Sequence, residues 1–364
     1  MRNLRLLVGF TSVLLAAPLL ADDAAPTTTT TTLTTAPSDA PLVAATAPAT
    51  LPATAPTSAP TTAPTTAPAT TQPFISWSNP PAEPLPLAPH HEYDSAAMKA
   101  KVGYSVYLPP RYGEAGNETR YPVVYWLHGL DATESPNGAG PQMIDDAIRA
   151  GKAPPMIVVY ASGGRRSWYA DSVDRQHLAE TTIVRELVPL IDANYRTIGT
   201  RGGRAIQGFS MGGTGAIKFG LKYPELFSSV VAYAPSLRNA EEMAELPTQQ
   251  QVYEVMFNAD AAQFMNEHPQ VLLDTGTADR VRDRVNFKLL IGDGDAPTLL
   301  RQLRAFHDRL TELKIEHEYT ELPGVGHELS DLLRLTGVDG LGFADSHFEK
   351  PDAPITEPPT TQPF

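Results

Sequence analysis

Strand-like apolar runs alternate with helical patterns between residues 102 and 322, and no other feature of the sequence restricts the fold as strongly. The alternation predicts strands at 102–108, 123–127, 156–160, 205–207, 230–233, 287–291 and 317–322. It predicts helices between them at 142–150, 178–194, 211–222 and 297–314. Strands joined by helices form a largely parallel sheet that is covered on both faces, so we expect an α/β fold.

One stretch, from about residue 236 to 285, breaks this alternation. It is rich in Ala, Glu, Gln and Met, which favours helices over strands. We therefore expect a helical insertion that lies over the carboxyl-terminal edge of the sheet and roofs the active site.

The first 21 residues have the pattern of a secretory signal peptide. Arg2 and Arg5 supply positive charge, Leu6 to Leu20 form an apolar run, and Ala21 is a plausible cleavage point. The run is shorter than the roughly 20 residues of a membrane-spanning helix. Cleavage and secretion, to the periplasm, the cell surface or the medium, are therefore favoured over an uncleaved membrane anchor.

The composition then changes twice along the chain. Residues 22–74 are almost entirely Ala, Pro and Thr and contain few large apolar side chains, so they predict a disordered linker. Residues 75–350 have a globular composition and a normal length for one α/β domain. Residues 351–364 return to the linker composition and predict a disordered tail.

The charge and the missing cysteines exclude several functions. The chain has 41 acidic and 28 basic residues, a net charge of -13, which disfavours nucleic acid and anionic membranes as partners. It has no cysteine, so neither disulfides nor thiolate metal sites can form. No histidine or carboxylate cluster has metal-ligand spacing, and we expect neither a metal nor a cofactor.

The strongest chemical signal is the segment Gly208-Phe-Ser210-Met-Gly212, followed by Gly213. It lies between a predicted strand and a predicted helix, the setting of a nucleophile elbow. Such a turn leaves no room for side chains two positions before and after the serine. The sequence therefore predicts that Ser210 is a nucleophile held above the sheet.

A serine hydroxyl needs a base to accept its proton. Of the nine histidines, His327 alone lies in a glycine-rich loop directly after the last predicted strand. In the chain order serine, acid, histidine, this loop is the place for the base. The acid should follow the strand at 287–291, where Asp293 and Asp295 are both candidates and Asp295 is preferred.

An oxyanion hole requires two N–H groups near the serine. One is the backbone N–H of Met211, the residue after the nucleophile. The other is expected in the loop after the strand at 123–127, where Gly129 permits a tight turn and Leu130 supplies the N–H. We expect His128 to hold this loop in place.

These segments resemble the esterase group of the α/β-hydrolase fold that contains feruloyl and acetyl-xylan esterases of carbohydrate esterase family 1. S-formylglutathione hydrolases and mycolyltransferases are related to this group. The matching segments are Val106-Tyr-Leu-Pro-Pro-Arg-Tyr112, Tyr121-Pro-Val-Val-Tyr-Trp-Leu-His-Gly129, Gly208-Phe-Ser-Met-Gly-Gly213 and Gly324-Val-Gly-His327.

The resemblance implies a catalytic triad of Ser210, Asp295 and His327 with oxyanion donors at Leu130 and Met211. In feruloyl esterases the acid lies three residues after a strand-ending glycine, which corresponds to Asp295 counted from Gly292. Two aromatic residues after the third predicted strand, Trp168 and Tyr169, either form a wall of the substrate pocket or pack in the core.

The sequence thus predicts a secreted serine esterase that forms an acyl-enzyme on Ser210. Its expected partner is an ester substrate, feruloyl or acetyl, on plant polysaccharide. The same triad would serve an acyltransferase that delivers the acyl group to a sugar hydroxyl. From another class, a surface-tethered binding protein could keep this fold without its chemistry. That protein would lack a triad member, and none is missing here.

Overall fold

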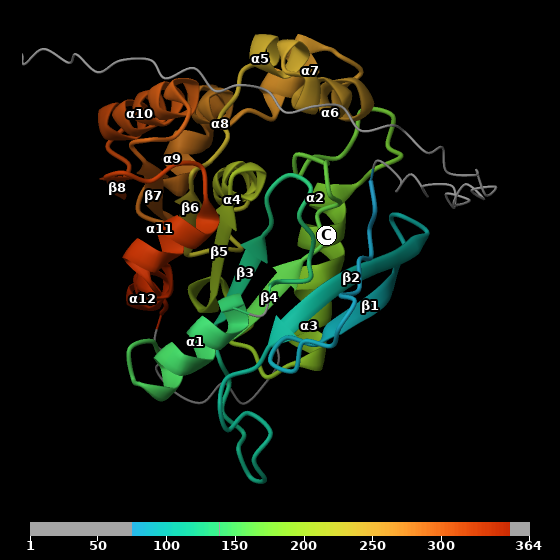
Figure 1. Cartoon of the computed structure of the whole chain (residues 1–364), viewed down its shortest axis with the longest axis vertical. Coiled ribbons are helices and arrows are strands. Elements are labelled where there is room, and N and C mark those ends of the chain that lie inside the picture. Colours follow the sequence, from blue (N-terminus) through green and yellow to red (C-terminus); the bar gives the residue numbers. More distant parts are fainter. Residues whose placement is uncertain (1–74, 138, 350–364) are drawn as a thin grey trace, which may run out of the picture. The chain divides into compact units, whose positions relative to one another are not determined.

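A mixed sheet of eight strands forms the centre of the part of the chain that the computed structural model describes, residues 75–137 and 139–349 (Figure 1). Its order is β1-β2-β4-β3-β5-β6-β7-β8. The strands are β1 (His90–Ser95), β2 (Ala100–Tyr107), β3 (Val123–Leu127), β4 (Ile157–Ala161), β5 (Arg204–Phe209), β6 (Ser229–Tyr233), β7 (Asn286–Gly292) and β8 (His317–Leu322). The predicted signal peptide 1–21, linker 22–74 and tail 351–364 lie outside the described residues.

In the order of the sheet, the six strands from β4 through β3 to β8 are all parallel. Strand β2 pairs antiparallel with both β1 and β4. The predicted α/β fold with a mostly parallel sheet is therefore confirmed. Strand β1 was not predicted, because its sequence His-His-Glu-Tyr-Asp-Ser is polar and gives no apolar run. An edge strand has only one paired side, so such a composition suits it.

Side chains that alternate along the strands pack into two different cores. Val124, Val158 and Ala205 belong to the smaller core, which also contains side chains of α1 (Ala139–Arg149) and α12 (Asp339–Ser346). Their neighbours Val123 and Ile206 belong to the larger core. The helices of that core include α2 (Ala179–Thr181), η1 (Thr182–Leu187), α3 (Val188–Asn194), α4 (Met211–Lys222) and α10 (Pro297–Glu312). Helices thus cover both faces, as expected for parallel strands.

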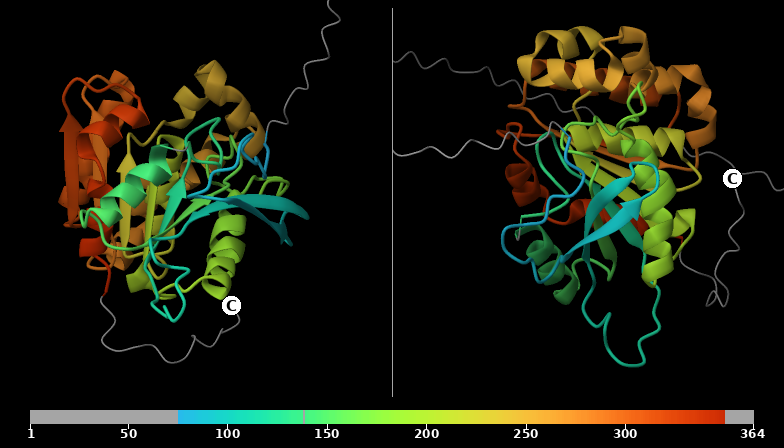
Figure 2. Two further views of the ribbon diagram at one scale, coloured as in Figure 1. Left: turned by 60° about the horizontal axis from the view of Figure 1, so that its bottom comes forward. Right: turned by 90° about the vertical axis from the view of Figure 1, so that its right-hand side faces the viewer.

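The stretch predicted as a helical insertion is helical. Its elements are α5 (Ala240–Glu245), α6 (Pro247–Phe257), α7 (Ala261–Asn266), α8 (Pro269–Leu272), η3 (Leu273–Thr277) and α9 (Ala278–Val281). Helices α5 to α7 gather at one end of the sheet (Figures 1 and 2). Asn239 and Glu242 form a capping box at α5, and Asp260 caps α7, which explains where these helices begin.

Two helices after the last strand were not predicted, α11 (Leu329–Thr336) and α12. Each has only eight residues, too few for a clear helical period in the sequence. In residues 75–137 and 139–349, no helix combines the length and apolarity needed to cross a membrane.

Candidate active site

Ser210 lies between the end of β5 and the start of α4 in a strained backbone conformation, with φ 56° and ψ -116°. The turn is tight on both sides. A Cβ at Gly212 would lie 2.1 Å from the carbonyl oxygen of Leu127, and one at Gly208 would lie 2.3 Å from that of Gly212. Only glycine fits at these positions, and this crowding holds the serine at the top of its strand.

His327 connects Ser210 to a buried carboxylate. Its Nε2 lies 2.8 Å from Ser210 Oγ, and its Nδ1 lies 2.7 Å from Asp295 Oδ2. The Asp295 side chain is fully buried, whereas 36% of the imidazole is exposed. An Nδ1–H that donates to Asp295 leaves Nε2 free to accept the serine proton, which is the tautomer a general base needs.

The structure separates the two candidate acids. Asp295 contacts the imidazole and also accepts the N–H of Ala296 at 2.6 Å. Asp293 is exposed, and its Oδ1 accepts the N–H of Gly324 at 2.7 Å. Asp293 therefore fixes the loop that carries His327, and Asp295 orients the ring itself.

Leu130 and Met211, the two residues expected to supply the oxyanion N–H groups, both line the cavity that contains Ser210. A Cβ at Gly129 would come within 3.6 Å of the Ser210 Cβ, so this loop passes directly beside the serine. In the part of the chain that the structure describes, neither N–H donates to a protein acceptor. Both donors are thus available to a developing oxyanion.

His128 and Tyr169 support the loop from behind. The His128 Nε2 accepts the N–H of Gly163 at 3.4 Å, so Nδ1 carries the proton and donates to Gly129 O at 2.9 Å. Burial lowers the pKa of His128 and keeps the ring neutral. The Tyr169 hydroxyl donates to His128 O at 2.9 Å.

Of the two alternatives for Tyr169, a wall of the substrate pocket or packing in the core, the structure supports packing in the core. Its side chain is fully buried and does not line the cavity. The ring fills the space that Gly163 and Gly215 leave open, since a Cβ at either would clash with it. Its neighbour Trp168 does line the cavity, although it is only 5% exposed.

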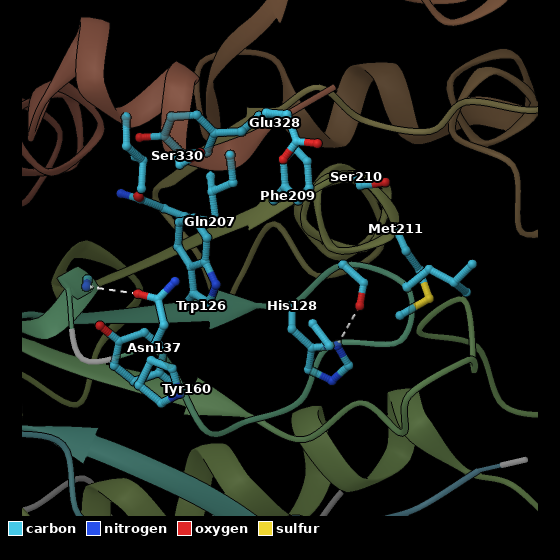
Figure 3. A pocket seen from close by; sticks show the side chains of 18 of the residues that line it. Trp126, His128, Asn137, Tyr160, Gln207, Phe209, Ser210, Met211, Glu328 and Ser330 are labelled. Atoms are coloured by element: carbon cyan, nitrogen blue, oxygen red, sulfur yellow. Dashed lines mark hydrogen bonds between the residues drawn. The ribbon is translucent and has the colours of Figure 1, made fainter. Parts of the chain in front are cut away.

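A cavity of about 880 Å³ opens at Ser210 and extends along the sheet. Its floor consists of strand side chains on the face that α1 and α12 cover: Val124, Trp126, Val158, Tyr160, Gln207 and Tyr233. Trp126 is the register partner of both Tyr160 and Gln207, and Figure 3 shows these three side chains away from Ser210. The cavity is therefore a mainly apolar site with a few polar groups.

Helices α1, α11 and α12 supply further lining side chains, among them Ile144, Leu333 and Leu341. The insertion contributes less than expected. Of residues 236–285, only Ser236, Arg238 and Gln249 line the cavity. The sequence could have indicated the strand residues that form the cavity floor. Trp126, Tyr160 and Gln207 stand out there as large or polar residues within otherwise apolar strands. In residues 75–137 and 139–349, no cluster of three His, Asp or Glu side chains could hold a metal.

Comparison with known proteins identifies the family. Residues 95–330 match the family described as "Putative esterase". The chain belongs to this esterase family. An esterase of Mycobacterium tuberculosis is 28% identical over 272 residues, which cover 69% of this chain and 58% of that one. The endo-1,4-beta-xylanase/feruloyl esterase of Xylanibacter ruminicola is 35% identical over 130 residues, 34% of this chain and 18% of its own length.

This member of the esterase family thus spans less than two thirds of the length of these curated relatives. Among solved structures, a ferulic acid esterase matches with a TM-score of 0.60 and 24% identity, over 72% of this chain and 98% of its own. An S-formylglutathione hydrolase from Agrobacterium tumefaciens matches with a TM-score of 0.56 and 19% identity, over 72% and 95%. At these identities the likeness concerns the fold, and it confirms the predicted α/β-hydrolase fold.

Proposed function

We propose that this esterase-family protein hydrolyses carboxylic esters through an acyl-enzyme on Ser210. The observation that carries the proposal is the unbroken line of hydrogen bonds from Asp295 through His327 to Ser210, 2.7 and 2.8 Å long. Each group has the partner that its role requires, and the line ends at a cavity large enough for a substrate.

Ser210 Oγ attacks the ester carbonyl carbon while its proton passes to His327 Nε2. The carbonyl oxygen becomes an oxyanion that accepts the N–H groups of Leu130 and Met211. The carbon–alkoxide bond then breaks, and the alkoxide takes the proton from His327. Water repeats the sequence on the acyl-enzyme, with His327 as base, and releases the acid and free Ser210. Asp295 stabilises the imidazolium in both halves.

The cavity supports a large, mostly apolar group on the substrate. An acetyl group would leave most of the 880 Å³ empty, whereas an aromatic acyl group such as feruloyl would cover Trp126 and Tyr160. We therefore propose feruloyl-type esters, including those on plant polysaccharide, ahead of acetyl esters. The feruloyl esterase activity in the name of the Xylanibacter ruminicola relative agrees with this choice.

We also propose secretion, which rests on residues 1–21 of the sequence. Expression of the full chain in a bacterial host should give a protein outside the cytoplasm whose first residue is Asp22. Mass spectrometry of its N-terminus tests this. A chain that keeps Met1 or stays in the cytoplasm would contradict it.

Two other functions receive less support. Acyl transfer to a sugar hydroxyl would use the same three side chains, and no contact in the described residues favours a sugar acceptor over water. A binding protein without chemistry would not need Ser210 Oγ aligned with His327 Nε2.

The first experiment compares the full chain with Ser210→Ala on 4-nitrophenyl acetate and methyl ferulate. Loss of the nucleophile should lower kcat by about 10⁴-fold or more. Circular dichroism shows whether the variant remains folded. A higher kcat/KM for methyl ferulate would support the aromatic acyl group. Equal rates for folded wild type and Ser210→Ala would refute a serine mechanism.

A further inference from the structure

Arg238 lines the same cavity as Ser210 but has no partner in the described part of the chain. It follows β6 closely, and the N–H of Ser236 donates to Ser210 O at 3.2 Å, so this segment lies beside the nucleophile. The Arg238 side chain is half-buried, and its Nε is buried without a hydrogen bond.

No neighbouring carboxylate in the described part of the chain forms an ion pair with the Arg238 guanidinium group. Burial lowers the pKa of Arg238, and the carboxylates of Glu242 and Asp295 oppose that shift without forming an ion pair. Both carboxylates have other partners. Glu242 accepts the N–H of Asn239 at 3.1 Å, and Asp295 accepts from His327. The donors of the guanidinium group are therefore free to meet a ligand.

A second polar group of the insertion is unsatisfied at the same cavity. Gln249 of α6 is only 8% exposed, and its Oε1 is buried without a partner. Its Nε2 reaches Thr248 Oγ1 only at 3.5 Å. Buried polar groups are normally paired, because an unmade hydrogen bond destabilises the fold. Two such groups in the lining of one cavity indicate a polar ligand there.

Arg334 provides a contrast, since it lines the cavity too but pairs with Asp331 at 3.2 Å. A guanidinium group has its donors in a planar fork that matches a carboxylate. The chain carries a net charge of -13, so an acidic substrate would be repelled unless a local cation held it.

We propose that Arg238 binds a carboxylate carried by the ester substrate and so selects acidic esters over neutral esters of the same shape. Arg238 is then a specificity-determining residue. The inference rests on the proposed ester hydrolysis at Ser210, but binding tests it separately. The carboxylate can belong to the acyl part or to the alcohol part of the ester, and paired probes distinguish the two.

One probe pair is mono(4-nitrophenyl) glutarate and its methyl ester, which differ by a charge on the acyl part. The other is 4-acetoxybenzoate and its methyl ester, which differ by a charge on the alcohol part. The full chain should prefer the acidic member of one pair. Arg238→Gln should lower kcat/KM for that member by about 10- to 100-fold, through KM, and leave its neutral partner within about twofold.

Two variants serve as controls. Arg238→Lys keeps the charge but loses the fork, and should retain part of the preference. Arg334→Gln should retain the full preference for the acidic ester. Equal losses for acidic and neutral esters in Arg238→Gln would indicate a structural role and overturn the proposal.

Titration of the same four esters into Ser210→Ala, with and without Arg238→Gln, measures binding without serine chemistry. The preferred acidic ester should bind about 10- to 100-fold more tightly when Arg238 is present. Arg238-dependent binding without any hydrolysis by the wild type would refute the proposed activity but not the carboxylate site. No preference for an acidic ester in either assay would overturn the site.

Discussion

Tyr169 shows how much one side chain behind the site can control. Its hydroxyl is bonded to His128 O, the carbonyl two residues before Leu130. Trp168 and Tyr169 both have positive φ values, 56° and 51°, which are unfavourable for bulky side chains. Such strain persists only where the surroundings enforce it. Here it brings an aromatic ring under the loop that supplies an oxyanion donor.

Tyr169→Phe should therefore lower kcat about tenfold with little change in KM, because the Leu130 N–H loses support that matters most in the transition state. The measurement is hydrolysis of 4-nitrophenyl acetate. Tyr93→Phe is the matched control, since its hydroxyl also donates to a backbone carbonyl, Thr182 O at 3.1 Å, but that carbonyl belongs to η1 and not to the loop of Leu130. If both variants kept the wild-type kcat, Tyr169 would be a packing residue only.

At the scale of elements, α11 joins the base to the wall of the cavity. The helix begins two residues after His327 and directs Leu333 toward the cavity, while Leu335 is 46% exposed. The base and the apolar wall therefore depend on one short element. A change in this wall should alter which esters fit without moving the triad.

Leu333→Trp should raise KM for methyl ferulate by about tenfold, since a larger side chain takes space that the aromatic acyl group needs. Hydrolysis of 4-nitrophenyl acetate should change by less than about twofold, because an acetyl group does not reach that space. Leu335→Trp on the same helix is the control and should affect neither substrate. Parallel losses on both esters in Leu333→Trp would place the acyl group elsewhere.

At the scale of the whole domain, four charged side chains connect distant parts of the chain. Lys218 and Lys222 of α4 pair with Glu180 of α2 and with Glu267 at the end of α7. The Lys218 side chain is 2% exposed, and its Nζ also donates to Tyr169 O at 2.6 Å. The insertion is thus joined by ion pairs to the helix that follows the nucleophile.

Burial would raise the pKa of Glu267, but Lys218 and Lys222 outweigh it and lower the pKa to about 2. A carboxyl with a lowered pKa stabilises the fold above its unfolded value, 4.5, and loses that contribution as the pH falls toward 2. Glu267→Gln should lower the free energy of unfolding by roughly 2–4 kcal/mol near neutral pH, because it leaves a buried lysine underpaired.

Urea unfolding at about pH 7 and about pH 3 measures this effect, and the deficit of Glu267→Gln should shrink at the lower pH. Glu225→Gln is the control. Its partner Arg280 lies 3.6 Å away and both side chains are more than half exposed, so the loss should stay below about 1 kcal/mol. A deficit for Glu267→Gln that does not change with pH would show that packing, not charge, is responsible.

The sequence by itself determined the parts that depend on local pattern. Apolar periodicity predicted the parallel strands, and glycines around Ser210 predicted the elbow, because a tight turn excludes side chains at fixed spacings. His327 followed from its place after the last strand. The polar edge strand β1 and the short helices α11 and α12 have no such local signature, so they were missed.

Tertiary structure alone decided which groups meet. Asp293 and Asp295 are two residues apart, and only the path of the loop directs one to the imidazole and the other to a backbone N–H. Tyr169 packs in the core behind the site and does not form the pocket wall that the sequence had offered as one alternative. The cavity lies mainly between the sheet, α1, α11 and α12. That the Arg238 guanidinium group lacks a partner in the described residues also follows only from the tertiary structure. Such contacts join residues far apart in the chain, and their geometry depends on how whole elements pack.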